Sequence, residues 1–349
     1  MPQKAARPRG WRRALAAGAA ALALLGAFSA PSQAMELAVQ DDSVFVQGRY
    51  GNRELAFTQS RALGMRWLRI NVVWSDYVRD GFRKYDDAVN AAQAHGFSVQ
   101  MTIVGTPAYD RGDRRLSWYK PNPARFASFA TTVATHFRGR VMRYSLWNEP
   151  NLGRWLAPSR QAPLTYRRLV LAAYPALKRV DGRNQVLIGE LTSSHDPLGF
   201  LRKTASGLKA DGLAYHPFEF YRRPGSGRST KGFIGINSTP TIKAALRDLA
   251  RRGKLTTLKR GSLPLYFTEF AYLTDGCCKT SEARRADWAP RAYKYARKQG
   301  VKQMLYYQLW QSPERDLGGE PWDSGIVGID GSPLRTYTAL LSASRTGFR

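Results

Sequence analysis

Residues 66–105 read RWLRINVVWSDYVRDGFRKYDDAVNAAQAHGFSVQMTIVG. Two runs rich in apolar and β-branched residues, 66–74 and 97–105, flank an amphipathic stretch from Tyr85 to His95. Runs that are almost continuously apolar are typical of parallel strands buried on both faces. Gly96 directly follows the amphipathic stretch, where a helix commonly stops. The segment therefore predicts a strand–helix–strand unit with parallel strands.

The same alternation continues along the chain. Further strands are expected at 43–47, 141–148, 185–191, 211–216, 264–270 and 303–310. Further helices are expected at 54–63, 123–137, 164–180, 197–209, 241–252 and 281–299. Such alternation fits either a closed (β/α)8 barrel or a doubly wound open sheet. No glycine-rich dinucleotide or phosphate fingerprint follows the first strand, so we predict an α/β fold with a single (β/α)8 TIM barrel.

The first 34 residues have the features of a secretory signal peptide. Five basic residues precede an Ala- and Leu-rich run at 14–30, and Ser32-Gln33-Ala34 offers the small residues that signal peptidase recognises. Because the run approaches the length of a membrane span, an uncleaved anchor is the alternative. We expect cleavage, which leaves a catalytic domain of residues 35–349. The mature protein is then secreted and has no stable membrane insertion.

The chain is strongly basic, with a formal net charge of +28. The basic residues are spread in twos and threes, as in Arg222-Arg223 and Arg251-Arg252, and form no single block. Either compositional bias or affinity for an acidic glycan would explain this excess. No nucleic-acid-binding motif accompanies it, so nucleic acid is not an expected partner.

Two carboxylates stand out among the residues expected at the C-terminal ends of strands, where barrel enzymes place their chemistry. Glu149 ends the fourth strand and Glu269 the seventh, and these strands lie nearly opposite each other across the barrel mouth. Glycoside hydrolysis needs one protonated carboxyl for the leaving oxygen and one ionised carboxylate for the anomeric carbon. The structural alternatives are a helix cap at Glu149 and a plain salt bridge between Glu269 and Arg69.

The segment Tyr144-Ser-Leu-Trp-Asn-Glu-Pro-Asn151 resembles the acid/base signature of the retaining glycosidases of clan A, a TIM-barrel superfamily. With Trp155 it is most similar to glycoside hydrolase family 39, the β-xylosidase and α-iduronidase type. Family 5, the cellulase and mannanase type, comes next. The resemblance covers about residues 43–342. It implies an O-glycosyl hydrolase that cleaves an extracellular poly- or oligosaccharide with retention.

The resemblance also implies roles for individual residues. Glu149 is the general acid/base, and Glu269 is the nucleophile that forms the glycosyl-enzyme. Arg69 keeps Glu269 ionised through a charge-assisted hydrogen bond, and Asn148 donates to the sugar 2-hydroxyl. Trp310 forms the floor of the sugar subsite by stacking on the ring. No metal or organic cofactor is expected, because two carboxylates and water suffice.

His216 is expected to line the pocket and to hydrogen-bond near the nucleophile or the sugar. Two residues later the superfamily often has a tyrosine that orients the nucleophile, but here the position is Phe218. Three other tyrosines are candidates for that role: Tyr215, Tyr221 and Tyr307. Four tryptophans are candidates either for sugar platforms or for packing between loops and helices: Trp74, Trp118, Trp155 and Trp322.

Two further positions depart from the family pattern. Glu190 ends the fifth strand, where small residues are usual, and either contacts substrate or pairs with a neighbouring arginine; pairing is favoured. Cys277 and Cys278 are adjacent, and outside the cytoplasm they are expected to oxidise to a strained disulfide over the sugar.

Two other functions fit the same sequence. A transglycosylase would use the same residues with an acceptor sugar in place of water. A catalytically silent barrel would bind anionic glycans through its basic surface.

Overall fold

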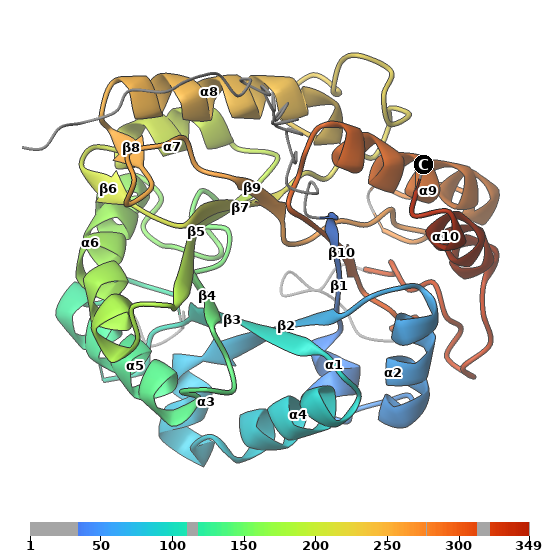
Figure 1. Cartoon of the computed structure of the whole chain (residues 1–349), viewed down its shortest axis with the longest axis horizontal. Coiled ribbons are helices and arrows are strands. Elements are labelled where there is room, and N and C mark those ends of the chain that lie inside the picture. The colour runs from blue at the N-terminus through green and yellow to red at the C-terminus, as the bar shows by residue number, and fades with distance from the viewer. Residues whose placement is uncertain (1–33, 110–117, 277, 313–321, 349) are drawn as a thin grey trace, which may run out of the picture. The chain divides into compact units, whose positions relative to one another are not determined.

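The computed structural model describes residues 34–109, 118–276, 278–312 and 322–348. In this part of the chain, eight parallel strands close into a barrel in the order β1-β10-β9-β7-β5-β4-β3-β2, which confirms the predicted (β/α)8 fold (Figure 1). The strands of the barrel are β1 (Glu36–Gln40), β2 (Trp67–Val73), β3 (Ser98–Val104), β4 (Arg143–Leu146), β5 (Gln185–Thr192), β7 (Gly212–His216), β9 (Leu265–Phe267) and β10 (Gln303–Tyr307).

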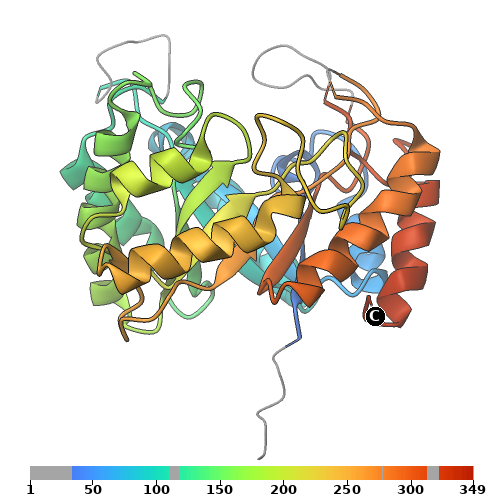
Figure 2. The same cartoon turned by 90° about the horizontal axis from the view of Figure 1, so that it is seen from above.

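Helices surround the barrel (Figures 1 and 2). The longer helices are α2 (Arg53–Ala62), α4 (Arg83–Ala94), α5 (Pro123–His136), α6 (Ala162–Val180), α7 (Pro197–Thr204), α8 (Thr239–Arg251), α9 (Glu282–Lys298) and α10 (Arg335–Arg345). In α8, Ile242, Leu246 and Leu249 are buried, whereas Arg247 and Arg251 are exposed. This spacing is the apolar stripe of a helix packed on one side.

Shorter elements complete the fold. They are the helices α1 (Asp42–Phe45), α3 (Trp74–Asp80) and η1 (Ile236–Ser238), and the strands β6 (Leu208–Lys209) and β8 (Leu255–Thr256). The last two pair with each other and lie outside the barrel sheet. Within the described residues, no helix is both long and apolar enough to cross a bilayer.

The first strand was predicted at 43–47, and this prediction is wrong. The strand is β1, seven residues earlier, and it pairs in parallel with both β10 and β2. Residues 42–45 form the one-turn helix α1 instead. Asp41 caps this helix by accepting a hydrogen bond from the backbone N–H of Val44 at 3.3 Å, so the apolar pair Val44-Phe45 is buried on a helical turn.

Strand β5 contains an irregularity that matters for the site. Its pairing register with β7 shifts between Gly189 and Leu191, which leaves Glu190 as the extra residue of a bulge. Gly189 has φ +105°, and a Cβ there would lie 2.6 Å from the carbonyl oxygen of Ala214. Glu190 itself has φ +46°, in the left-handed region that few non-glycine residues adopt. The bulge places the Glu190 carboxylate inside the barrel, where the residue is completely buried.

Candidate active site

A cavity of about 620 Å³ opens at the C-terminal ends of the barrel strands. Asn148, Glu149 and Glu269 line it together with Tyr307. The two glutamates retain 9% and 8% exposure, so both reach the edge of the cavity from an otherwise buried cluster. The walls are rich in aromatic side chains: Trp118, Trp155, Phe218, Phe220, Phe233 and Trp322.

The structure brings the two predicted carboxylates together. Glu149 follows β4 with φ +39°, and its backbone N–H donates to the carbonyl oxygen of Glu190 at 2.9 Å. Glu269 follows β9 on the other side of the barrel mouth. One carboxylate oxygen from each glutamate and one ring nitrogen of His216 all lie within 4.8 Å of one another. The strand-end positions in the sequence therefore correspond to one shared site.

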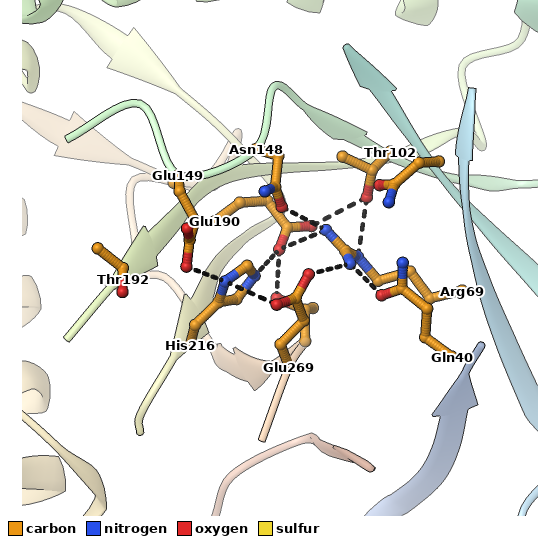
Figure 3. A network of polar contacts seen from close by, with 12 residues as sticks. Gln40, Arg69, Thr102, Asn148, Glu149, Glu190, Thr192, His216 and Glu269 are labelled. Carbon is orange, nitrogen blue, oxygen red and sulfur yellow. Dashed lines mark hydrogen bonds and ion pairs between the residues drawn. The ribbon is translucent and has the colours of Figure 1, made fainter. Parts of the chain in front are cut away.

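Arg69 lies in β2 and ties the cluster together (Figure 3). Its Nη1 donates to Oε1 of Glu269 at 2.6 Å, and its Nη2 donates to Oδ1 of Asn148 at 2.8 Å. Nη2 also lies 3.3 Å from Oε2 of Glu190. Nε donates to Thr102 at 2.9 Å, and Nη1 also donates to Gln40. The contact of Arg69 with Glu269 was predicted from the sequence. Arg69 also forms hydrogen bonds with Asn148, Thr102 and Gln40 and an ion pair with Glu190.

His216, at the end of β7, bridges three carboxylates (Figure 3). Its Nδ1 lies 3.0 Å from Oε1 of Glu149 and 3.4 Å from Oε2 of Glu269. Its Nε2 lies 2.7 Å from Oε2 of Glu190. Burial by itself lowers the pKa of His216, but the charge of Glu269 and the contacts with Glu149 and Glu190 outweigh it and raise the pKa to about 9. The carboxylates around His216 thus favour its imidazolium form at neutral pH.

Burial raises the pKa of both Glu190 and Glu269, but the net shift has opposite signs in the two groups. Burial raises the pKa of Glu190, but the guanidinium of Arg69 and then His216 outweigh this effect and lower the pKa to about 2. For Glu269, burial raises the pKa, and the charges of His216 and Arg69 only partly oppose it. Glu190 is also held by Thr268, whose hydroxyl donates at 2.5 Å. Glu190 is thus a permanent anion of the site.

The pairing predicted for Glu190 is confirmed by its ion pair with Arg69. Its second partner, His216, was not predicted, because the β5 bulge that turns this side chain inward leaves little trace in a linear sequence. The one local signal is Gly189, the glycine that the bulge requires.

Trp310 lies away from the cavity, in disagreement with the predicted stacking floor. Strand β10 ends at Tyr307, three residues earlier than expected, and the chain then turns so that Trp310 bridges to Val327. Its indole N–H donates to Gln59 at 3.1 Å, and only 3% of the residue is exposed. Tyr307 takes the place in the cavity wall at the end of this strand.

Of the three tyrosines considered in place of Phe218, Tyr307 is the one that lines the same cavity as Glu269. The hydroxyl of Tyr215 instead donates to the backbone oxygen of Ile234 at 2.7 Å. The hydroxyl of Tyr221 donates to Sγ of Cys278 at 3.2 Å. Because Cys277 lies outside the described residues, the predicted disulfide stays a prediction.

The four candidate tryptophans divide into two groups. Trp118 and Trp155 pack with ring centroids 4.8 Å apart and line the cavity, as Trp322 does. Trp74 is stacked on Phe129 at 5.3 Å, away from this cavity.

Glu149, His216 and Glu269 are near enough to one another to hold a metal ion on distance alone. A protonated histidine has no lone pair to offer a metal. Arg69 and the His216 imidazolium already place two positive charges beside the carboxylates. The fixed charge of Arg69 beside Glu269 and Glu190 disfavours a further cation at the same place.

Residues 29–312 match the family model described as cellulase (glycosyl hydrolase family 5). No curated protein matches the chain in sequence. Among solved structures, a family 39 enzyme from Xanthomonas axonopodis pv. citri has a TM-score of 0.67 at 18% identity, over 90% of this chain and 67% of that one. A family 39 β-xylosidase from Caulobacter crescentus has a TM-score of 0.66 at 16% identity, over 90% and 72%.

A family 39 glycoside hydrolase from Bacteroides cellulosilyticus WH2 has a TM-score of 0.65 at 16% identity. The match covers 89% of this chain but only 63% of the length of that enzyme. At such identities the likeness concerns the fold. The sequence resemblance placed family 39 first and family 5 second. The family model is family 5, and the similar structures include family 39.

Proposed function

We infer that this chain, which belongs to the cellulase family (glycosyl hydrolase family 5), hydrolyses an O-glycosidic bond with retention of anomeric configuration. It is an O-glycosyl hydrolase, and its substrate is a carbohydrate. The retaining course, the residue roles and the extracellular poly- or oligosaccharide are our proposal. The N-terminal leader supports a secreted enzyme and hence a substrate outside the cell.

The observation that carries the proposal is the short distance between Glu149 and Glu269, whose nearer carboxylate oxygens lie within 4.8 Å of each other. Retaining glycosidases have carboxyl groups about 5–5.5 Å apart, because one of them must bond to the sugar itself. Inverting enzymes need about 6.5–9.5 Å, so that a water molecule fits between the carboxylate and the anomeric carbon. The spacing favours retention.

In the first step, Glu269 attacks the anomeric carbon while Glu149 gives its proton to the leaving oxygen, which forms a covalent glycosyl-enzyme. Arg69 holds Oε1 of Glu269 at 2.6 Å, and we assign the attack to Oε2, which lies 3.4 Å from Nδ1 of His216. Because Oδ1 of Asn148 accepts from Arg69, its amide N–H groups are directed to the sugar 2-hydroxyl. In the second step, Glu149 takes a proton from a water molecule whose oxygen bonds to the anomeric carbon, and the bond between that carbon and Glu269 breaks, which frees the sugar and restores the Glu269 carboxylate.

The experiment is a panel of aryl glycosides and polysaccharides, with the anomer of the first product followed by NMR. We expect the product to keep the anomeric configuration of the substrate. Glu149→Gln and Glu269→Gln should each lower kcat by roughly 10²-fold or more, and Glu54→Gln, with 71% of its side chain exposed, serves as the surface control. Inversion would rule out the proposed mechanism, and two variants as active as the wild type would rule out the residue roles.

A further inference from the structure

Glu190 has no place in the two-carboxylate reaction, yet it is among the most enclosed groups of the site. Its carboxylate contacts Arg69, His216 and Thr268, and a further hydrogen bond comes from Thr102 at 3.2 Å. A buried ion is tolerated only when it is paired and hydrogen-bonded, as it is here. Glu190 also has a left-handed backbone conformation and lies in the bulge of β5. Such local strain tends to occur at functional sites.

The position of Glu190 fixes how His216 faces the reaction. Because Nε2 of His216 donates its proton to Glu190, Nδ1 must point at Glu149 and Glu269. If His216 were neutral, Nδ1 would present a lone pair to two carboxylates, which is repulsive unless Glu149 donates a proton into it. If His216 is an imidazolium, Nδ1–H donates to them.

We propose that Glu190 is a positioning residue that holds His216 as an imidazolium, with Nδ1–H directed at the acid/base and the nucleophile. The proposal rests on the roles proposed above for Glu149 and Glu269. It does not require Glu190 to touch the sugar.

The charges of the cluster agree with this assignment. The groups that face His216 are Glu149 after β4, Glu190 in β5 and Glu269 after β9, and Arg69 from β2 contacts the last two. Two cations, Arg69 and His216, balance the anions Glu190 and Glu269. Arg69 and His216 each contact both Glu190 and Glu269, whereas Glu149 contacts His216.

The connection extends to the backbone. The carbonyl oxygen of Glu190 accepts the N–H of Glu149, and Glu149 lies in the left-handed region next to it. The same residue thus fixes the main chain of the acid/base through its carbonyl and the orientation of His216 through its carboxylate.

The test is ¹⁵N NMR of histidine-labelled enzyme. The chain has four histidines, and single replacements of His95, His136 and His195 assign the signals of His216. In the native enzyme at pH 7 we expect both ring nitrogens of His216 to carry a proton. An unprotonated Nδ1 at pH 7 would overturn the proposal without any variant, since it would show Glu149 donating into a neutral ring.

Glu190→Gln keeps the size and an acceptor oxygen but removes the charge. We expect the titration midpoint of His216 to fall by at least one pH unit, and kcat on aryl glycosides to fall at least 10-fold with little change in KM. Glu219→Gln is the matched control: Glu219 is fully buried too and is held by Thr230 at 2.6 Å. It should leave the His216 midpoint unchanged.

An unchanged His216 midpoint in Glu190→Gln would overturn the proposal even if activity fell. Conversely, the expected titration together with fully active Glu149→Gln and Glu269→Gln variants would overturn the proposed function and leave the arrangement of His216 intact. The two failures are therefore distinguishable.

Discussion

Replacing Arg69 by methionine tests the charge balance of the site most directly. Arg69 is 1% exposed and contacts Glu269 at 2.6 Å and Glu190 at 3.3 Å. Methionine fills most of the volume but leaves these two buried carboxylates with His216 as their remaining cation in the cluster. Removing one partner of a buried ion pair costs about 3–5 kcal/mol. For a domain of roughly 300 residues, this corresponds to a melting temperature lower by about 5–8 °C at neutral pH.

The stability that Arg69→Met loses relative to the native enzyme should depend on pH in a defined direction. Burial already raises the pKa of Glu269, and Arg69 opposes that effect, so the variant should bind a proton on Glu269 at a higher pH than the native enzyme. A neutral carboxyl needs no cation, so the difference in stability is largest above the pKa of Glu269 in the variant and shrinks as pH falls through it. Differential scanning calorimetry from pH 4 to pH 8 measures both the loss in melting temperature of the variant and the direction in which this loss changes with pH.

Arg285→Met is the matched control. Arg285 is also fully buried, and it pairs with Glu282 at 2.6 Å on helix α9, away from the cavity. The Arg285→Met variant should have a lower melting temperature but a kcat within about 2-fold of the native value. Arg69→Met, in contrast, should lower kcat at least 10-fold. A melting temperature of Arg69→Met within 1 °C of the native one, or a loss that grows as pH falls, would refute the reasoning.

Three further replacements test other features. Gly189→Ala brings a Cβ within 2.6 Å of the carbonyl oxygen of Ala214 at φ +105°, so we expect a loss of roughly 2–4 kcal/mol in urea unfolding; Gly182→Ala, with open space around it, should change stability by less than about 1 kcal/mol. Tyr307→Phe should lower kcat on aryl glycosides by about 10-fold if its hydroxyl orients the nucleophile, and native kinetics would exclude that role. Trp310→Phe should lower the melting temperature but leave KM unchanged, and a specific rise in KM would place it in the sugar subsite after all.

Much of the fold could be predicted from the sequence, because buried parallel strands and one-sided helices have distinct apolar patterns. Strands β2, β3, β5 and β7 were predicted to within one residue at each end, and β4 to within two. The first strand was missed because Val44 and Phe45 give a strand-like pattern, whereas the preceding aspartate caps a helical turn. Local pattern cannot tell which short apolar run pairs with strands far away in the chain.

The two carboxylates, Arg69 and His216 were predictable because strand ends converge in a barrel. The contact of Glu190 with His216 was not predicted, and Tyr307 was only one of three candidate tyrosines. Each depends on a local departure from regular strand geometry, a bulge in β5 and an early end of β10, which shifts the side chain that faces inward. A shift of one residue reverses the face on which a side chain lies.

The origin of the cluster in seven of the eight barrel strands bears on how the enzyme is made. Arg69 and Glu149 emerge early in synthesis, whereas Glu190, His216 and Glu269 follow later, and the pair Arg69–Glu269 joins positions 200 residues apart. Contacts between such distant positions form late in folding, after the loops between them have closed. The site is therefore assembled only once segments from β1 to β9, most of the length of the chain, have folded together.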